Sequence, residues 1–177
     1  LKKLERAEIR ILESDDVIES ETKAEQLQKL MNQKESHYLS VDLQDVERTH
    51  IGWEVHPEAL LKLLTDLHQT YKLPPIYITE NGAAVDDHVV DGVVDDEQRY
   101  RYYQNHLSMV HEAIKIGVDI RGYFAWSLMD NFEWAEGYKM RFGIVYVDYE
   151  TQKRTLKNSA IKFQEFLSAR KAGLLQE

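Results

Sequence analysis

The distribution of apolar and polar positions along the chain changes near Ile51. Residues 1–50 are strongly charged, hold only short apolar pairs and contain neither Gly nor Pro. Within them, Ala7–Ile11 alternates like a short strand, and Glu21–Lys34 shows the apolar face of a helix. The pattern predicts a charged, mostly helical segment or insertion over residues 1–50, and it favours a solvated surface over a specific interaction surface.

Residues 51–177 show a regular succession of helical and extended patterns. A helix is expected after Pro57, because proline suits the first helical position. Its apolar face comprises Leu60, Leu64, Leu67 and Tyr71. Two prolines end this helix, and Ile76–Thr79 is then expected to form a buried strand.

A second helix and a second buried strand follow an acidic loop. Asp95 is expected to cap the helix, with Gln98 completing a capping-box-like pair. The apolar face of this helix comprises Tyr103, Leu107, Val110 and Ile114, and Gly117 suits its C-terminal end. The next buried strand is expected within Val118–Trp126.

The C-terminal part continues with an extended segment and a last helix. Arg141–Tyr149 looks extended, and a helix capped by Asn158 is expected to bury Ile161, Phe163 or Phe166, and Leu167. The order helix, strand, helix, strand indicates parallel strands with helical crossovers. Two parallel strands do not make a stable sheet alone, so residues 51–177 are expected to be part of a larger α/β structure.

Composition narrows the function classes without identifying one. The formal net charge of -9 argues against nucleic acid as a partner, because nucleic-acid binding depends on clustered cations. No apolar run approaches the roughly 20 residues that span a bilayer, so no membrane association is expected. The absence of cysteine is compatible with a reducing compartment, and the cytoplasm is the expected location.

Chemically active side chains follow both predicted strands, where parallel α/β folds place their functional groups. Glu80, in Thr79–Gly82, is a candidate catalytic carboxylate, with a plain turn in which Asn-Gly supplies a positive φ as an even alternative. In Trp126–Trp134, two indoles flank acidic and amide groups. Core packing explains either Trp alone, but Asp130 and Glu133 would each need a partner if buried. A cleft that stacks sugar rings on indoles and binds their hydroxyls accounts better for the whole cluster.

The motifs in these segments resemble those of glycoside hydrolase family 1, the retaining β-glucosidases and β-galactosidases. The resemblance rests on Tyr77–Gly82, Gly122–Trp134 and Gly137–Tyr149, and Ile51–Glu58 is similar to the segment ahead of the family's sixth barrel helix. It implies an α/β fold that is the C-terminal part of a (β/α)8 TIM barrel, with about the last two strands and their helices. Such a part is incomplete as a stand-alone barrel, since a full barrel takes about 250 residues.

The resemblance also implies roles for five residues. Glu80 matches the family's nucleophile, and Trp126 matches the indole that lines the subsite of the cleaved sugar. Glu133 matches the carboxylate that bridges two hydroxyls of that sugar. Trp134 matches a neighbour that bonds the 3-hydroxyl, and Phe142 an aromatic at the inner wall. No cofactor and no metal are implied, and the 7 His residues show no close metal-binding spacing.

The second catalytic carboxylate that the resemblance implies, the acid/base, has no match in this chain. The family's acid/base lies in a Thr-x-Asn-Glu-Pro motif, which this chain does not contain. Glu54, Asp86, Asp87 and Glu136 are acid candidates by residue type only. The acid/base is therefore expected on an N-terminal piece of the same enzyme, which would be a partner of this chain; residues 1–50 carry no recognisable family motif.

Three hypotheses remain open. The first is the C-terminal piece of a retaining β-glycosidase, inactive in isolation, that acts by double displacement on β-glucosides or short β-linked oligosaccharides. β-Galactosides are the alternative substrates, since Glu133 suits either epimer. The second is a catalytically inactive sugar-binding module, and the third is a truncated product without a function of its own.

Overall fold

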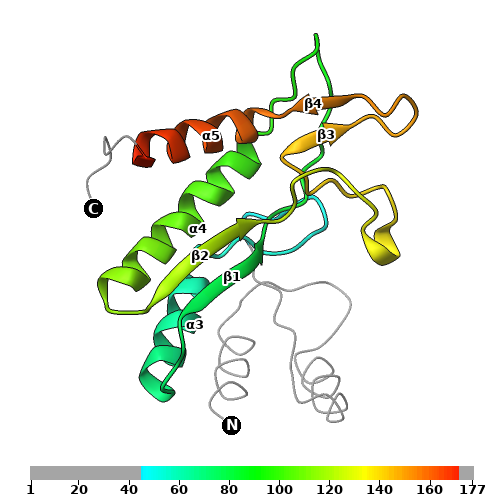
Figure 1. Ribbon diagram of the computed structural model, residues 1–177. Helices are drawn as coiled ribbons and strands as arrows, with labels where there is room; N and C mark the ends of the chain where they lie inside the picture. Colours follow the sequence, from blue (N-terminus) through cyan, green and yellow to red (C-terminus); the bar gives the residue numbers. More distant parts are fainter. Residues whose placement is uncertain (1–44, 172–177) are drawn as a thin grey trace, which may run out of the picture. The chain divides into compact units, whose positions relative to one another are not determined.

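The computed structural model describes residues 45–171, so the strand and helix expected at Ala7–Ile11 and Glu21–Lys34 lie outside the described residues. The elements follow in the order α3 (Pro57–Thr70), β1 (Ile76–Asn81), α4 (Glu97–Lys115), β2 (Ile120–Ala125), η1 (Trp134–Glu136), β3 (Val145–Val147), β4 (Arg154–Leu156) and α5 (Asn158–Lys171) (Figure 1). No helix within the described range is long and apolar enough to cross a membrane.

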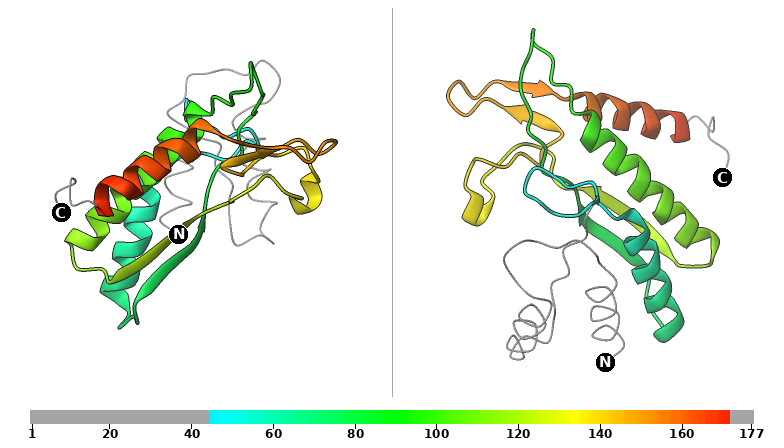
Figure 2. Two further views of the ribbon diagram at one scale, coloured as in Figure 1. Left: turned by 45° about the horizontal axis from the view of Figure 1, so that its top comes forward. Right: turned by 180° about the vertical axis from the view of Figure 1, so that it is seen from behind.

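β1 and β2 are parallel neighbours, which confirms the arrangement predicted from the order of elements. α3 and α4 lie on one side of this sheet, and α4 packs against both α3 and α5 (Figure 1, Figure 2). The core between them comprises Leu64, Ala113 and Val118, with Ile76, Ile78 and Ile120 packed against it. On the other face, Tyr77 and Phe124 are 55% and 56% exposed, so the prediction of fully buried strands is wrong for the described residues.

The start of α4 differs from the expected capping arrangement. The N-cap residue is Asp96, not Asp95, and its side chain makes no capping hydrogen bond. The Asp96 carboxylate instead accepts hydrogen bonds from the main chain (2.8 Å) and hydroxyl (2.5 Å) of Ser159, and it pairs with Arg99 at 2.5 Å. A partner 63 positions away thus replaces local capping, which no local sequence rule anticipates.

The outer helices and the C-terminal strands also depart from the expected patterns. Tyr71 lies beyond the end of α3 and is 60% exposed. Ile161 and Leu167 of α5 are exposed, so the predicted apolar faces of both helices are only partly buried. The extended segment expected at Arg141–Tyr149 contains β3, which pairs in antiparallel fashion with β4, a strand that was not predicted.

A buried network of ion pairs joins the segment after β1, the segment after β2 and the start of α5. It comprises three carboxylates and three cations, namely Asp87, Asp96, Asp130, Arg99, Arg141 and Lys157. The fully buried Lys157 side chain bridges Asp87 (2.5 Å) and Asp130 (2.7 Å). The equally buried Arg99 binds both carboxylate oxygens of Asp87, at 3.1 and 2.7 Å. Opposite charges in equal number offset the cost of removing them from water.

Replacing Lys157 by Met is expected to lower the free energy of unfolding by about 3 kcal/mol, because removal of one buried partner leaves uncompensated charge behind. Equilibrium denaturation in urea measures the change. Lys162→Met, on the helix that directly follows Lys157, is the matched control: Lys162 forms an exposed pair with Glu165, so we expect a change below about 0.5 kcal/mol. Equal losses in both variants would contradict the structural role of the network.

Candidate active site

Glu80 lies at the end of β1, and the chain after it passes directly against the main chain of Trp126. Glu80 is exposed, and no side chain within residues 45–171 hydrogen-bonds to its carboxylate. A Cβ on Gly82 would lie 1.7 Å from the Trp126 carbonyl oxygen, and Gly82 does not have a positive φ. Glycine is therefore required here by close backbone approach, and the alternative of a positive-φ turn is wrong.

Trp126 immediately follows β2 and is joined through its main chain to both β1 and α4. Its N–H donates to the carbonyl of Asn81 at 2.8 Å, and its carbonyl accepts the hydroxyl of Tyr103 at 3.1 Å. The Trp126 side chain is half-buried. These contacts bring the two segments that follow the parallel strands to the same rim of the sheet, as expected for this kind of fold.

Asp130 anchors the segment after β2 instead of offering its carboxylate to a ligand. Its Oδ1 accepts from Lys157 (2.7 Å) and the Gly143 N–H (3.0 Å), and its Oδ2 accepts from Arg141 (2.6 Å). A Cβ on Gly143 would lie 2.1 Å from the Asp130 nitrogen, so only glycine permits this approach. Asp130, which the sequence grouped with the sugar-binding cluster, is therefore part of the buried ion network.

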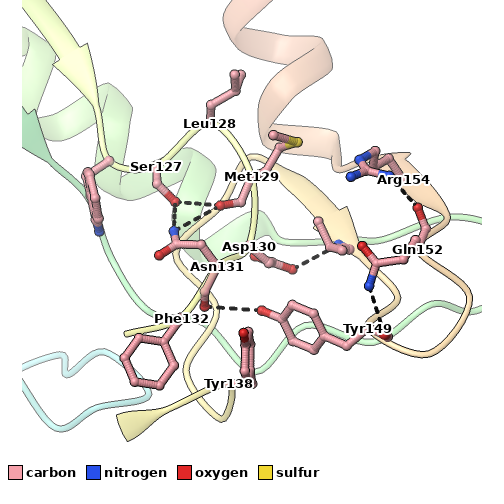
Figure 3. A pocket seen from close by; sticks show the side chains of 12 residues that line it. Ser127, Leu128, Met129, Asp130, Asn131, Phe132, Tyr138, Tyr149, Gln152 and Arg154 are labelled. Carbon is pink, nitrogen blue, oxygen red and sulfur yellow. Dashed lines mark hydrogen bonds between the residues drawn. The ribbon is translucent and has the colours of Figure 1, made fainter. Parts of the chain in front are cut away.

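Glu133 is the acidic side chain of this segment that keeps free bonding capacity. It is 9% exposed, and its buried Oε1 has no hydrogen-bond partner in the described part of the chain. The Asn131 amide, in contrast, donates to a hydroxyl and a carbonyl of its own segment, each at 3.1 Å (Figure 3). A buried oxygen without a partner is rare in proteins, so Glu133 is suited to receive a donor from a ligand.

Burial and neighbouring charges both act on the pKa of the Glu133 carboxyl. Burial raises its pKa above the ordinary value, and the nearby polar groups of Trp126 and Asn131 oppose that rise. The negative charges of Glu80 and Asp130 raise the same pKa further. Glu80 and Glu133, from the ends of two different strands, therefore lie close enough at the rim to influence each other.

The two remaining predicted site residues differ in exposure. Trp134, in η1, is 84% exposed and has a φ of 47°. Phe142 is 4% exposed, and its ring lies 6.1 Å from that of Trp53. Its carbonyl accepts the N–H of Ser127 at 3.1 Å, which holds it beside the end of β2. Trp134 is thus open to solvent, whereas Phe142 is buried and packs against Trp53.

A hollow of about 650 Å³ lies beside Trp126, on the segment after β2 (Figure 3). Its aromatic lining includes Tyr138, with Phe132 and Tyr149 edge-on to it at ring-centroid distances of 5.6 and 4.7 Å. Trp126 lines this hollow, but Glu80 and the other predicted site residues do not. In the described residues, the predicted sugar site is therefore an open rim.

None of the acid candidates proposed by residue type gains support from the geometry. Asp87 is buried in the ion network, while Asp86 and Glu54 form ion pairs with basic neighbours near the surface. Glu136 is exposed in η1 and is held in no site. Within residues 45–171, no group of His, Cys, Asp and Glu side chains could hold a metal ion.

The sequence patterns did not predict the residues that hold the rim in place. The hydroxyls of Tyr102 and Tyr123 contact the side chain of Asn81, and that of Tyr103 binds the Trp126 carbonyl. Of these, Tyr103 was expected on an apolar helix face, but hydrophobic periodicity does not predict the hydrogen-bond partner of its hydroxyl. The buried cations carried no signal either, because Arg and Lys near helix starts usually lie in solvent.

Sequence comparison with known proteins supports the resemblance that the motifs indicate. The model of glycosyl hydrolase family 1 matches residues 8–172, which include most of the segment in which no family motif was recognised. A β-glucosidase from Agrobacterium sp. is 58% identical over 112 residues, which is 63% of this chain and 24% of that protein. β-Glucosidase A from Thermotoga maritima is 53% identical over 116 residues, 65% of this chain and 26% of that protein.

The structural comparison agrees. The crystal structure of a psychrophilic β-glucosidase from Micrococcus antarcticus superposes with a TM-score of 0.72 and 53% sequence identity. The match covers 73% of this chain and 28% of that one. The chain therefore spans about a quarter of the length of the relatives it matches.

Glu80→Gln is expected to lower the pKa of the Glu133 carboxyl, because it removes a negative charge that raises it. A ¹³C NMR titration of the Glu133 side chain measures this pKa, which should lie above 4.5 in the unsubstituted chain. Glu136→Gln is the control, since Glu136 is exposed and does not contribute to the shift. A titration midpoint unmoved by Glu80→Gln would contradict the proximity of the two carboxylates.

Proposed function

The chain belongs to glycosyl hydrolase family 1, and from this premise we propose that it carries the nucleophile side of a retaining β-glycosidase site. Its described residues are part of the family's (β/α)8 barrel, with β1 and β2 as consecutive parallel strands. The observation that supports the proposal most is the placement of Glu80 at the end of β1 and of Glu133 on the segment that follows the neighbouring parallel strand β2. One carboxylate is exposed for attack, and the other is buried with a free oxygen.

Glu80 is the nucleophile in this proposal. Its carboxylate attacks the anomeric carbon of a β-glucoside, and the bond to the leaving oxygen breaks as the bond to Glu80 forms. Water then displaces Glu80 from the covalent glycosyl-enzyme with a second inversion, so the configuration is retained. The exposed position of Glu80 at the strand end is consistent with access for a sugar.

The sugar is held by the residues around Glu80. The free Oε1 of Glu133 accepts a sugar hydroxyl, which satisfies a buried oxygen that otherwise lacks a partner. Such a bond lowers the barrier if it strengthens as the ring approaches an oxocarbenium ion. Trp126 offers an apolar indole face to the ring, the exposed Trp134 an N–H to the 3-hydroxyl, and Phe142 closes the inner wall.

The acid/base comes from an N-terminal piece of the same enzyme in this proposal. A retaining glycosidase needs a protonated carboxyl about 5–5.5 Å from the nucleophile, and none of the carboxylates considered in the described range suits that role. An N-terminal piece of the same enzyme, with the Thr-x-Asn-Glu-Pro motif, would supply it together with the remaining strands. The chain alone is then inactive, and the absence of cysteine supports the cytoplasm as its location.

β-Glucosides, including short β-linked oligosaccharides, are the proposed substrates. Two relatives that share more than half of their aligned residues with this chain are β-glucosidases. β-Galactosides are the alternative, because a carboxylate such as Glu133 can bond a hydroxyl in either configuration. The second candidate function is an inactive sugar-binding module, which is favoured by the free oxygen of Glu133 in a chain without the acid motif.

Mixed with the N-terminal piece, the chain is expected to hydrolyse an aryl β-glucoside, and Glu80→Ala to lower turnover by at least about 10⁴-fold, the size of effect seen for groups that act together in catalysis. Folding should be nearly unchanged, because Glu80 is exposed. Release of the aryl alcohol measures turnover. Azide should restore that release in Glu80→Ala and yield the inverted α-glucosyl azide, because it attacks in place of the missing carboxylate.

Glu165→Ala, which removes an exposed carboxylate of α5, is the control and should leave turnover unchanged. Full turnover in Glu80→Ala would refute the nucleophile assignment. Glucose binding by the unsubstituted mixture without any turnover would favour the inactive module, and absence of both would favour a truncated product.

A further inference from the structure

We propose that Asn81 is a positioning residue that aims the neighbouring Glu80 at the substrate, because its side chain is clamped between the hydroxyls of Tyr102 and Tyr123. This role rests on the proposed function, in which Glu80 attacks the sugar. It follows from the irregular register of β1, from the hydrogen bonds of the Asn81 amide, and from the packing of Tyr102.

The pairing of β1 with β2 is irregular just before Asn81. Between Ile78 and Asn81, β1 advances by three residues where β2 advances by two, which reverses an opposite shift between Ile76 and Tyr77. In a regular strand, Glu80 would share the face of the two β1 isoleucines, which pack against the helices. The irregularity breaks this alternation, so that Glu80 is exposed. Bulges often re-aim a side chain next to an active site.

The Asn81 side chain is held at both ends of its amide. Its Oδ1 accepts the hydroxyl of Tyr123 from β2 at 2.7 Å, and its Nδ2 donates to the hydroxyl of Tyr102 from α4 at 3.3 Å. Its main-chain carbonyl also accepts the N–H of Trp126 at 2.8 Å. These bonds fix the Asn81 amide on the side of β1 that faces α4. A rotation of the strand end that moved Glu80 to this side would break them.

Tyr102 is itself held by packing, and Tyr123 is part of β2. The ring of Tyr102 stacks on His106 at a centroid distance of 3.8 Å, and the ring of Tyr103 meets it edge-on at 6.0 Å. Burial raises the pKa of both the Tyr102 and the Tyr123 hydroxyl, so both stay protonated at neutral pH. An amide suits this place because it offers an acceptor and a donor on one short side chain.

The direction of Glu80 bears on the rate and not on sugar binding. Attack needs the carboxylate oxygen aligned with the anomeric carbon, and a misplacement of about 1 Å can cost about 100-fold in rate. The side chain of Asn81 bonds to Tyr102 and Tyr123, neither of which is among the groups proposed to hold the sugar. Loss of its clamp should therefore slow bond formation while the contacts of Trp126 and Glu133 remain.

The test uses this chain mixed with the piece that supplies the acid/base. Tyr123→Phe is expected to lower kcat about 10-fold and Asn81→Ala about 100-fold, while the inhibition constant of glucose changes less than about twofold. The double variant should be no slower than Asn81→Ala, because Tyr123 acts through Asn81. Tyr100→Phe is the matched control: its hydroxyl bonds Gln104 of the same helix at 2.8 Å, and both constants should stay unchanged.

An unchanged kcat, additive losses in the double variant, or a parallel rise of the inhibition constant would overturn the positioning role. A crystal structure of the Asn81→Ala chain decides the same question without activity. A displaced Glu80 with Trp126 in its original place would support the positioning role. This result would hold even if the unsubstituted mixture showed no turnover, because absent turnover refutes only the proposed function. An unmoved Glu80 in that structure would overturn the positioning role of Asn81.

Discussion

The structure depends on the ion pairs that the buried Lys157 makes with Asp87 and Asp130. Asp87 follows β1, Asp130 follows β2, and Lys157 directly precedes α5, so one ammonium group joins three segments that are far apart in the sequence. Charges removed from water stabilise a fold only if each is matched. Arg99 and Arg141 complete that match, since they bind the oxygens that Lys157 leaves available.

Two close backbone contacts position the segments that follow β1 and β2. At Gly82 against Trp126, and at Gly143 against Asp130, the chains approach so closely that no Cβ would fit. The first contact sets Glu80 beside the end of β2, and the second fixes the base of the segment that carries Glu133. As a result, the charge of Glu80 raises the pKa of the Glu133 carboxyl. The proposed chemistry therefore depends on backbone packing as much as on the rim side chains themselves.

Local patterns predicted the helices, the parallel strands and the two chemically active segments, because periodicity, prolines and short motifs act over a few residues. The buried network escaped prediction, since Asp87 and Lys157 are 70 positions apart and Asp87 lies in an acidic stretch that looks solvated. The same limit applies to Asp96, whose distant partner Ser159 replaced local capping. The bulge before Asn81 and the free oxygen of Glu133 are likewise products of pairing and packing, which residue type alone does not encode.

The central claim is that Glu80 forms a covalent bond to the sugar, and trapping that bond tests it most directly. A 2-deoxy-2-fluoro-β-glucoside with a good leaving group should form a long-lived adduct, because fluorine disfavours the oxocarbenium-like transition state of its hydrolysis. After incubation with the chain and the N-terminal piece, peptide mapping by mass spectrometry locates the sugar. We expect it on Glu80, within the peptide that contains Ile76–Gly82. A sugar bound to any other carboxylate, Glu133 included, would contradict the account.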